Sequence, residues 1–261
     1  MSLLVHKNLS LPVDTLRFSE YWKRSKFISC INMTIERNAS NPYLPKDKTI
    51  QSMSLLMRHL VSFDIYPFLN FGTLLVAHSR NSISTKSLTP SKDFVITGWF
   101  RECDIIPHTK DIDFAAFVEE YKPELLKHLQ SNEAKFYLKR KLGKVNDSYE
   151  LTLLPLNSNR PMMDLFWLYS AANESWVGGT SSDGTKYKYT YPRITDICAA
   201  DLLGHIFWVP CDPELIVKTD YGPQWYKDWP SSNFSWYSSQ YNVKKNGKWT
   251  SQEMKEVYKV Y

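Results

Sequence analysis

The sequence lacks the short signatures of several large functional classes. Nowhere do 18 uncharged apolar residues follow one another, so no transmembrane helix is expected from it. It contains no Gly-x-Gly-x-x-Gly, no Walker loop, no His-Glu-x-x-His and no Gly-x-Ser-x-Gly. These absences argue against a dinucleotide enzyme, a P-loop NTPase, a zinc protease of this type and an α/β-hydrolase.

Cysteine and concentrated charge are also scarce. The chain has no Cys-x-x-Cys pair and no His/Cys zinc spacing, and its cysteines are Cys30, Cys103, Cys198 and Cys211. Their even number permits disulfides without implying them. The net charge of +5 is compatible with a phosphate-bearing substrate, but no basic stripe points to nucleic acid. The basic run at residues 139–141 is predicted to be a solvated face.

The chain is long enough for a large core. It has 261 residues, 43% hydrophobic, which allows one domain with an accessory segment. Residues 1–50 are interpreted as an accessory segment or linker and residues 51–261 as the main domain. Apolar spacing predicts a helix over residues 51–63. Residues 114–131 are predicted as strand then helix, and further strands at 136–138, 149–154, 162–169 and 205–210, with a hairpin over 173–192.

Two stretches carry little regular pattern. Residues 76–97 are rich in Ser, Thr and Lys and are predicted to form a flexible loop. From Asp212 the chain is rich in Trp and Tyr and is predicted to be loop-like, with a short helix near 250–260. Its aromatic residues either stack on a sugar or pack an irregular segment; they include Trp225, Tyr226, Trp229, Trp236 and Tyr237.

The chemistry is predicted to centre on Asp111 and Asp113. They form an Asp-x-Asp at the start of a predicted strand, and residues i and i+2 of a strand point to the same face. The two carboxylates would lie roughly 6.6 Å apart at about 3.3 Å of rise per residue. At an effective dielectric near 20 they would repel by about 2–3 kcal/mol. A divalent cation offsets such a cost, and Mg²⁺ often shares carboxylates with substrate phosphates. The alternative is a solvated strand end.

A third acid, Asp164, lies inside a predicted strand of Met, Leu, Phe and Trp. An acid in such a run is paired, functional, or placed on the one exposed face of a sheet. The functional interpretation puts it on a strand next to Asp111 and Asp113, where it could help to hold metal and act as a base for a hydroxyl nucleophile.

Other candidates carry weaker signals. Gly72-Thr73 either offers backbone N–H groups to a phosphate at a tight turn or forms an ordinary turn. Arg101 either contacts a phosphate or pairs with Glu102 or Glu119. His108 either lies near the leaving group or is a surface histidine.

Sequons give a hint about the compartment. Asn8, Asn32, Asn38, Asn146, Asn173 and Asn233 each begin an Asn-x-Ser/Thr triplet. That is more than the roughly two expected from ordinary Ser/Thr usage, and it hints at the secretory pathway. The opening residues show no signal-peptide pattern.

Longer motifs resemble a known family. Gly72-Thr73-Leu74-Leu75, GWFREC (98–103) and IIPHTKDIDF (105–114) resemble the active-site signature of the fukutin/LicD family. Matches continue in LGKVNDSYEL (142–151), MDLFWLY (163–169), WVPCDPE (208–214), YGPQW (221–225) and NVKKNGKW (242–249). The resemblance covers roughly residues 51–261.

The resemblance implies an α+β, nucleotidyltransferase-like fold, in which helices flank a mixed sheet and the C-terminal segment is irregular. It implies a transferase that moves a phospho-alditol, such as ribitol 5-phosphate from CDP-ribitol, to a sugar hydroxyl of a glycoprotein O-mannosyl glycan in the Golgi. Other Golgi glycosyltransferases would be partners. Asp111 and Asp113 would bind Mg²⁺ or Mn²⁺, Asp164 would be the third acid, and Gly72 and Thr73 would form the phosphate turn. The alternative is a non-catalytic member that binds a glycan or a partner transferase.

The chain departs from the family pattern in two places. Bacterial members carry acids directly before the Asp-x-Asp. This chain has Thr109 and Lys110 there instead, which is the pattern of animal-type members. Residues 76–97 form an insertion between Leu75 and Gly98, which relatives join directly. It is either a tolerated surface loop or a segment that disables the site. The absence of a visible anchor leaves a soluble, cytoplasmic protein as the alternative location.

Overall fold

A strand of large apolar residues, β7 (Met162–Ser170), lies at the centre of the sheet. Met163, Leu165 and Trp167 have no exposed surface. β7 pairs in parallel with β4 (Asp111–Phe117) and antiparallel with β6 (Asp147–Pro155) and β8 (Glu174–Thr180). This computed structural model describes residues 3–6, 9–33, 42–74, 98–105, 109–225 and 235–261.

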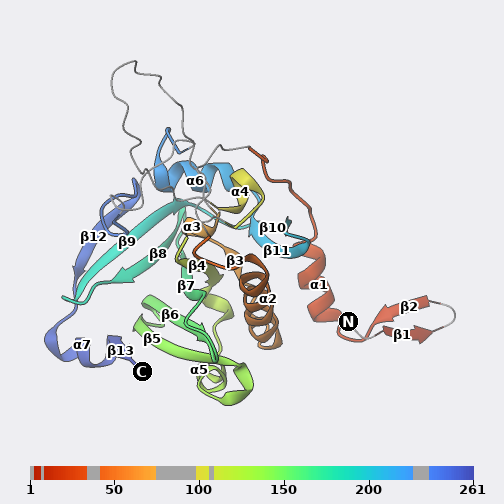
Figure 1. Cartoon of the computed structure of the whole chain (residues 1–261), viewed down its shortest axis with the longest axis horizontal. Helices are drawn as coiled ribbons and strands as arrows, with labels where there is room; N and C mark the ends of the chain where they lie inside the picture. The colour runs from red at the N-terminus through yellow and green to blue at the C-terminus, as the bar shows by residue number, and fades with distance from the viewer. Residues whose placement is uncertain (1–2, 7–8, 34–41, 75–97, 106–108, 226–234) are drawn as a thin grey trace.

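Further strands extend the sheet on both sides of β4 and β7. They are β3 (Phe68–Leu69), β5 (Phe136–Lys144), β9 (Thr185–Pro192), β10 (Ile197–Leu202), β11 (His205–Pro210), β12 (Val243–Lys248) and β13 (Tyr258–Val260). The main path is β10-β11-β3-β4-β7-β6-β5-β13, while β8, β9 and β12 branch from β7 (Figure 1). Two parallel pairs, β4–β7 and β11–β3, occur among antiparallel ones. A separate two-stranded sheet joins β1 (Leu3–His6) and β2 (Leu9–Pro12).

Helices flank this sheet, as Figure 1 shows. They are α1 (Thr15–Lys23), α2 (Lys46–Ser62), α3 (Phe71–Leu74), α4 (Trp99–Glu102), α5 (Pro123–Leu129), α6 (Pro213–Tyr221) and α7 (Ser251–Val257), with 3₁₀ turns η1 (Val118–Glu120) and η2 (Asn132–Ala134). The predicted α+β class, a mixed sheet flanked by helices, is therefore confirmed.

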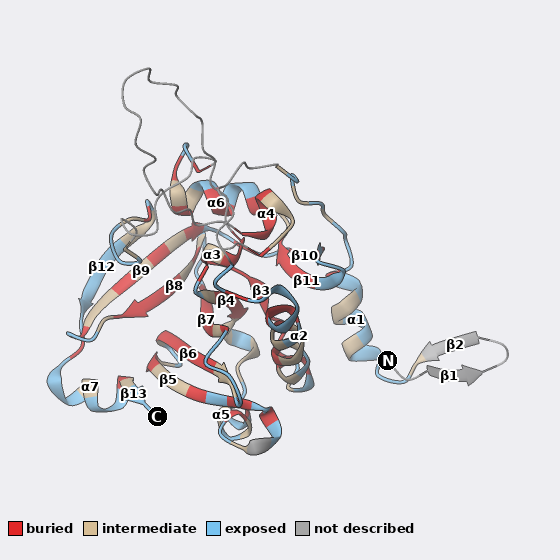
Figure 2. Ribbon diagram, viewed as in Figure 1, coloured by how far each residue is buried: buried red, intermediate tan, exposed pale blue. Residues whose placement is uncertain are grey.

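Helix α2 buries the apolar stripe that predicted it. Met53, Leu56 and Leu60 have no exposed surface and follow the helical spacing. The helix begins at Lys46 because Pro45 precedes it as the N-cap residue, and proline lacks the N–H that a helix interior needs. The predicted division at residue 50 consequently falls inside α2. Buried residues concentrate on the central strands and on the inward side of this helix (Figure 2).

Two disulfides join distant parts of the chain. Cys30 pairs with Cys103, which ties the segment after α1 to the end of α4, and Cys198 pairs with Cys211 across the β10–β11 hairpin. Backbone hydrogen bonds reinforce the first link, since Ile31 and Met33 donate to the carbonyls of Phe100 and Arg101. Disulfides persist in oxidising compartments.

The region after Asp212 is more regular than its composition predicted. α6 and β12 lie where a loop was expected. Ahead of this region, strand β10 was also not predicted. Local sequence explains where α6 begins. The Asp212 side chain accepts a hydrogen bond from the Leu215 N–H, and Pro213 occupies the first helical position. The aromatic residues that follow obscured this start signal.

Candidate active site

Four polar side chains form one row across four strands of the sheet. Arg140 of β5 is the register partner of Thr152 of β6, which partners Asp164 of β7, which partners Asp113 of β4. Register partners in neighbouring strands present their side chains on the same face. The pairing therefore brings a guanidinium, a hydroxyl and two carboxylates together from positions far apart in sequence.

Asp111 and Asp113 stand at the N-terminal end of β4, both half-buried on one face, with buried Ile112 between them on the other. The strand is anchored there by Thr73, whose Oγ1 accepts the Asp113 N–H at 2.7 Å. The Gly72 N–H donates to the Asp113 carboxylate. A Cβ at position 72 would lie 3.3 Å from Asp113 Oδ2, so glycine allows this close approach.

Asp164 is buried, with 6% of its surface exposed. Its Oδ1 accepts the Thr152 hydroxyl at 2.5 Å, and Arg140 Nη2 lies 3.8 Å from the same oxygen. Arg140 Nε also donates to Thr152 Oγ1 at 3.2 Å. Hydrogen bonds and an ion pair thus connect Arg140, Thr152 and Asp164.

A fourth acid, Glu150 of β6, lies on the same side and is 7% exposed. Burial, with Asp164 nearby, raises the pKa of Glu150 to about 8. Burial raises the pKa of Asp164 to about 6, against the hydrogen bond from Thr152. The pKa of Asp113 is raised well above its usual value by burial and by Asp111, Asp164 and Glu150. Four acids thus gather beside Arg140, with Lys110 and Lys139 also acting on them. A cationic or phosphate–metal ligand would favour their charged forms.

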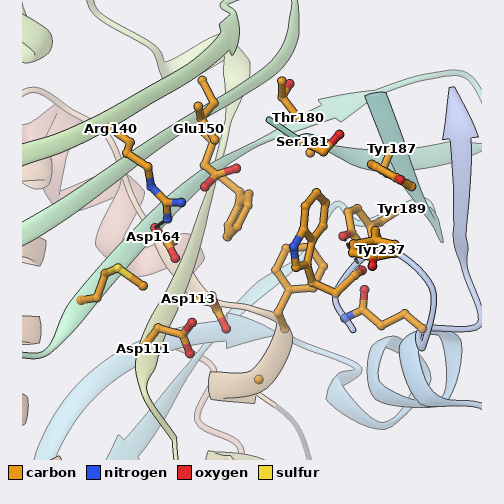
Figure 3. A pocket seen from close by; sticks show the side chains of 18 of the residues that line it. Asp111, Asp113, Arg140, Glu150, Asp164, Thr180, Ser181, Tyr187, Tyr189 and Tyr237 are labelled. Atoms are coloured by element: carbon orange, nitrogen blue, oxygen red, sulfur yellow. Dashed lines mark hydrogen bonds and ion pairs between the residues drawn. The ribbon is translucent and has the colours of Figure 1, made fainter. Parts of the chain in front are cut away.

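These groups line one cavity of about 850 Å³. In Figure 3, Arg140, Asp164, Asp111 and Asp113 stand on one side, while Tyr187, Tyr189 and Tyr237 stand across from them. The acids come from β4, β6 and β7, and the tyrosines come from β9 and from the turn before β12. The cavity therefore has an acidic side and an aromatic side.

A divalent cation fits the chemistry of the acidic side. Hard carboxylate oxygens are the ligands that Mg²⁺ prefers, and burial raises the pKa of both Asp113 and Asp164. In the described part of the chain, no three His, Cys, Asp or Glu side chains converge as a ready-made metal site. Mg²⁺ usually takes only one or two carboxylates and completes its shell with water and substrate phosphates, so two carboxylates such as those of Asp111 and Asp113 would suffice as protein ligands.

The other predicted site residues are placed differently. Gly72 lines the cavity within α3, where its N–H serves Asp113. Arg101 is fully buried in α4 and its Nε donates to Glu102 Oε1 at 2.8 Å, which is the ion-pair alternative. It is not among the described residues that line the cavity. His108 and the insertion 76–97 lie outside the described residues.

Sequence reasoning missed Arg140 and Glu150. The run at residues 139–141 was predicted to be a solvated face, which is wrong for Arg140. A register shift between Leu138 and Arg140 pairs Arg140 with Thr152, and Arg140 lines the cavity. Glu150 carried the same signal that singled out Asp164, an acid inside an apolar strand, and that signal was overlooked.

Comparisons with known proteins point in one direction. Residues 96–212 match the family model described as "LicD/FKTN/FKRP, nucleotidyltransferase domain". The chain is similar to two uncharacterised proteins of Caenorhabditis elegans, 42% identical over 260 residues and 40% over 261. It is also 30% identical over 263 residues to the ribitol-5-phosphate transferase FKTN of Mus musculus.

These matches extend over nearly the whole chain but not over the whole of the relatives. They cover 98%, 97% and 97% of this chain, but 62%, 63% and 51% of those three proteins. The chain thus spans between about half and two thirds of the length of the curated relatives it matches.

Proposed function

Because residues 96–212 belong to the LicD/FKTN/FKRP family of nucleotidyltransferase domains, we propose that the protein is a metal-dependent phospho-alditol transferase. The donor would be CDP-ribitol or a similar CDP-alcohol, and the acceptor a sugar hydroxyl of a glycoprotein O-mannosyl glycan. The observation that carries the proposal is the row of Asp113, Asp164, Thr152 and Arg140, in which the two acids and the arginine line one cavity.

The acids and the arginine of this row, with Asp111 and the turn at residues 72–73, are assigned distinct roles. Asp111 and Asp113 would hold Mg²⁺ or Mn²⁺, which supplies Lewis-acid neutralisation of the diphosphate charge when bound. Arg140 lies across the row and would contact a phosphate oxygen through its planar fork. Gly72 and Thr73 act by fixing the Asp113 carboxylate and backbone.

Asp164 is suited to accept the proton of the attacking hydroxyl. Its Oδ1 is engaged by Thr152 and faced by Arg140, which leaves Oδ2 for the acceptor. The acceptor oxygen forms a bond to the phosphorus that carries the alditol, and the bond from that phosphorus to the bridging oxygen breaks. CMP leaves with the electron pair, and the hydroxyl proton passes to Asp164.

The test is transfer by the purified chain. With CDP-ribitol, Mn²⁺ and an O-mannosyl glycan, the wild type should release CMP and add one ribitol phosphate to the glycan. Asp113→Asn should abolish both products while the circular dichroism spectrum stays unchanged. Full turnover by that variant would refute the assignment.

A second candidate function rests on the aromatic side of the cavity. Trp236 and Tyr237 are 42% and 48% exposed and line the cavity, which suits stacking on a sugar in a non-catalytic family member. Glycan binding that needs neither metal nor CDP-ribitol would favour this function over transfer.

The place of action is proposed to be the Golgi or another secretory compartment, with other Golgi glycosyltransferases as partners. The two disulfides and the exposed sequon asparagines Asn32, Asn146 and Asn173 support this. Within the described residues, no helix has the length and apolar character needed to cross a membrane.

A further inference from the structure

The aromatic side of the cavity has no role in phosphoryl transfer itself. It is built by β8, β9 and the segment 235–242, across from the acids (Figure 3). A nucleotide donor needs a surface for its base as well as one for its phosphates. An inference about that surface rests on the proposed function and deepens it.

The Trp236 ring packs against strand β8 on one side and is partly exposed elsewhere. A Cβ on Gly179 of β8 would lie 2.9 Å from Trp236 Cζ3, so the ring packs directly on a strand that glycine leaves bare. Tyr187 meets the ring edge-on at 5.2 Å between centroids, and the Tyr189 hydroxyl donates to the Trp236 carbonyl at 2.7 Å. With its place fixed and 42% of the residue exposed, Trp236 offers a preorganised stacking surface.

Gln240, which lines the same cavity, carries a hydrogen-bond acceptor. Gln240 is 7% exposed and lines the cavity, and its Nε2 donates to Tyr221 Oη at 3.4 Å. Its Oε1 is buried and has no hydrogen-bond partner among the described residues. A buried acceptor without a partner is unfavourable, so Oε1 is ready for a donor group on a ligand.

The backbone around Gln240 is fixed by α6. The Tyr241 N–H donates to the Asp220 carbonyl at 2.7 Å, and Asn242 Nδ2 donates to Asp220 Oδ1 at 2.9 Å. Gly222 leaves room for the Tyr241 ring, since a Cβ there would lie 2.6 Å from it. The amide of Gln240 is therefore presented from a constrained segment.

We propose that Trp236 stacks the nucleobase of the donor and that Gln240 Oε1 reads the exocyclic amino group of cytosine. Cytosine has an N–H donor at the position where uracil has a carbonyl oxygen. A carbonyl oxygen facing Oε1 would leave both acceptors unpaired, so uridine nucleotides are disfavoured. The cavity of about 850 Å³ lies in the range of nucleotide-sized ligand sites.

The experiment compares calorimetric binding of CDP and UDP in Mn²⁺ by the full chain. The wild type should bind CDP at least tenfold more tightly than UDP. Gln240→Met, which keeps the length of the side chain and removes the acceptor, should weaken CDP about tenfold and leave UDP nearly unchanged. Gln240→Glu, which keeps an acceptor, should retain the preference for CDP.

Trp236→Ala should weaken both nucleotides about tenfold or more without altering their ratio, because stacking does not depend on the base. Trp22→Ala is the matched control, since Trp22 of α1 is 70% exposed and does not line the cavity. Thermal melts of each variant establish that it is folded.

Two outcomes separate this inference from the proposed function. If Gln240→Met keeps the wild-type ratio and Trp236→Ala keeps the wild-type affinities, while Asp113→Asn loses binding, the base lies elsewhere and only the inference fails. If the folded wild type binds neither nucleotide in Mn²⁺, both the proposed function and the inference fail.

Discussion

Asp113 and Asp164 are register partners across the parallel pair of β4 and β7. Two acids in facing positions on neighbouring strands oppose one another electrostatically. Asp111 and Glu150 add to the repulsion, and the pKa of Asp113 is raised well above its usual value. A fold that keeps such a cluster holds it at a cost to stability, which is typical of a functional site.

Replacing Asp113 with Asn should stabilise the metal-free protein while abolishing metal-dependent binding. The substitution keeps an acceptor for Gly72 and removes one of several crowded charges, which is worth about 1–3 kcal/mol at an effective dielectric near 20. Urea unfolding at pH 8 with a chelator measures the gain. Glu214→Gln in the exposed pair with Lys218 is the control and should change stability little. A destabilised Asp113→Asn would mean that this acid has a structural role.

Arg140 should matter for donor affinity more than its place in a basic run indicates. Arg140→Met is expected to weaken CDP-ribitol binding by tenfold or more, because it removes a charge-assisted contact to phosphate. Arg140→Lys should recover part of the loss, since the charge remains and the planar fork does not. Lys141→Met, next to it in sequence and not among the described cavity residues, should bind normally. Equal losses at positions 140 and 141 would argue for a diffuse charge effect.

The two disulfides should contribute unequally to stability. The sequence separations are 73 for Cys30–Cys103 and 13 for Cys198–Cys211. Chain-entropy estimates give about 4 kcal/mol for the longer loop and about 3 kcal/mol for the shorter. Urea unfolding of Cys30→Ser and Cys198→Ser would compare them. A larger loss for Cys198→Ser would show that local geometry outweighs loop length.

Asp220 should make the protein less stable as pH rises. Burial raises its pKa to about 7, against the hydrogen bond that Asn242 Nδ2 donates, from an ordinary value of 3.8. The pKa of Asp220 is higher in the folded protein than in the unfolded chain. Its contribution to the free energy of unfolding is therefore fully present below about pH 4 and is lost as the pH rises to about 7. The full loss is on the order of 4 kcal/mol at 1.36 kcal/mol per pKa unit.

Asp220→Asn should therefore be more stable than the wild type at pH 8 and gain much less at pH 5. Thermal unfolding at both pH values measures this difference. A variant whose gain is the same at both would show that Asp220 does not titrate in this range.

The sequence predicted the local features of the site and missed those set by strand register. Asp111 and Asp113 lie on β4, with Asp164 on the adjacent β7, because acids inside apolar runs mark strands that bury one face. Whether they bind metal stays a prediction. Arg140 and Glu150 reach the cavity through the pairing of β5, β6 and β7, which no single-strand pattern encodes. The same holds for Trp236, whose place depends on the bare surface at Gly179.

The most direct test of the central claim is calorimetric binding of CDP-ribitol with and without Mn²⁺, on the wild type and on Asp113→Asn. The account predicts saturable binding by the wild type that requires the metal, and none by the variant under the same conditions. Metal-independent binding of equal strength by both proteins would contradict it, as would no binding by a folded wild type.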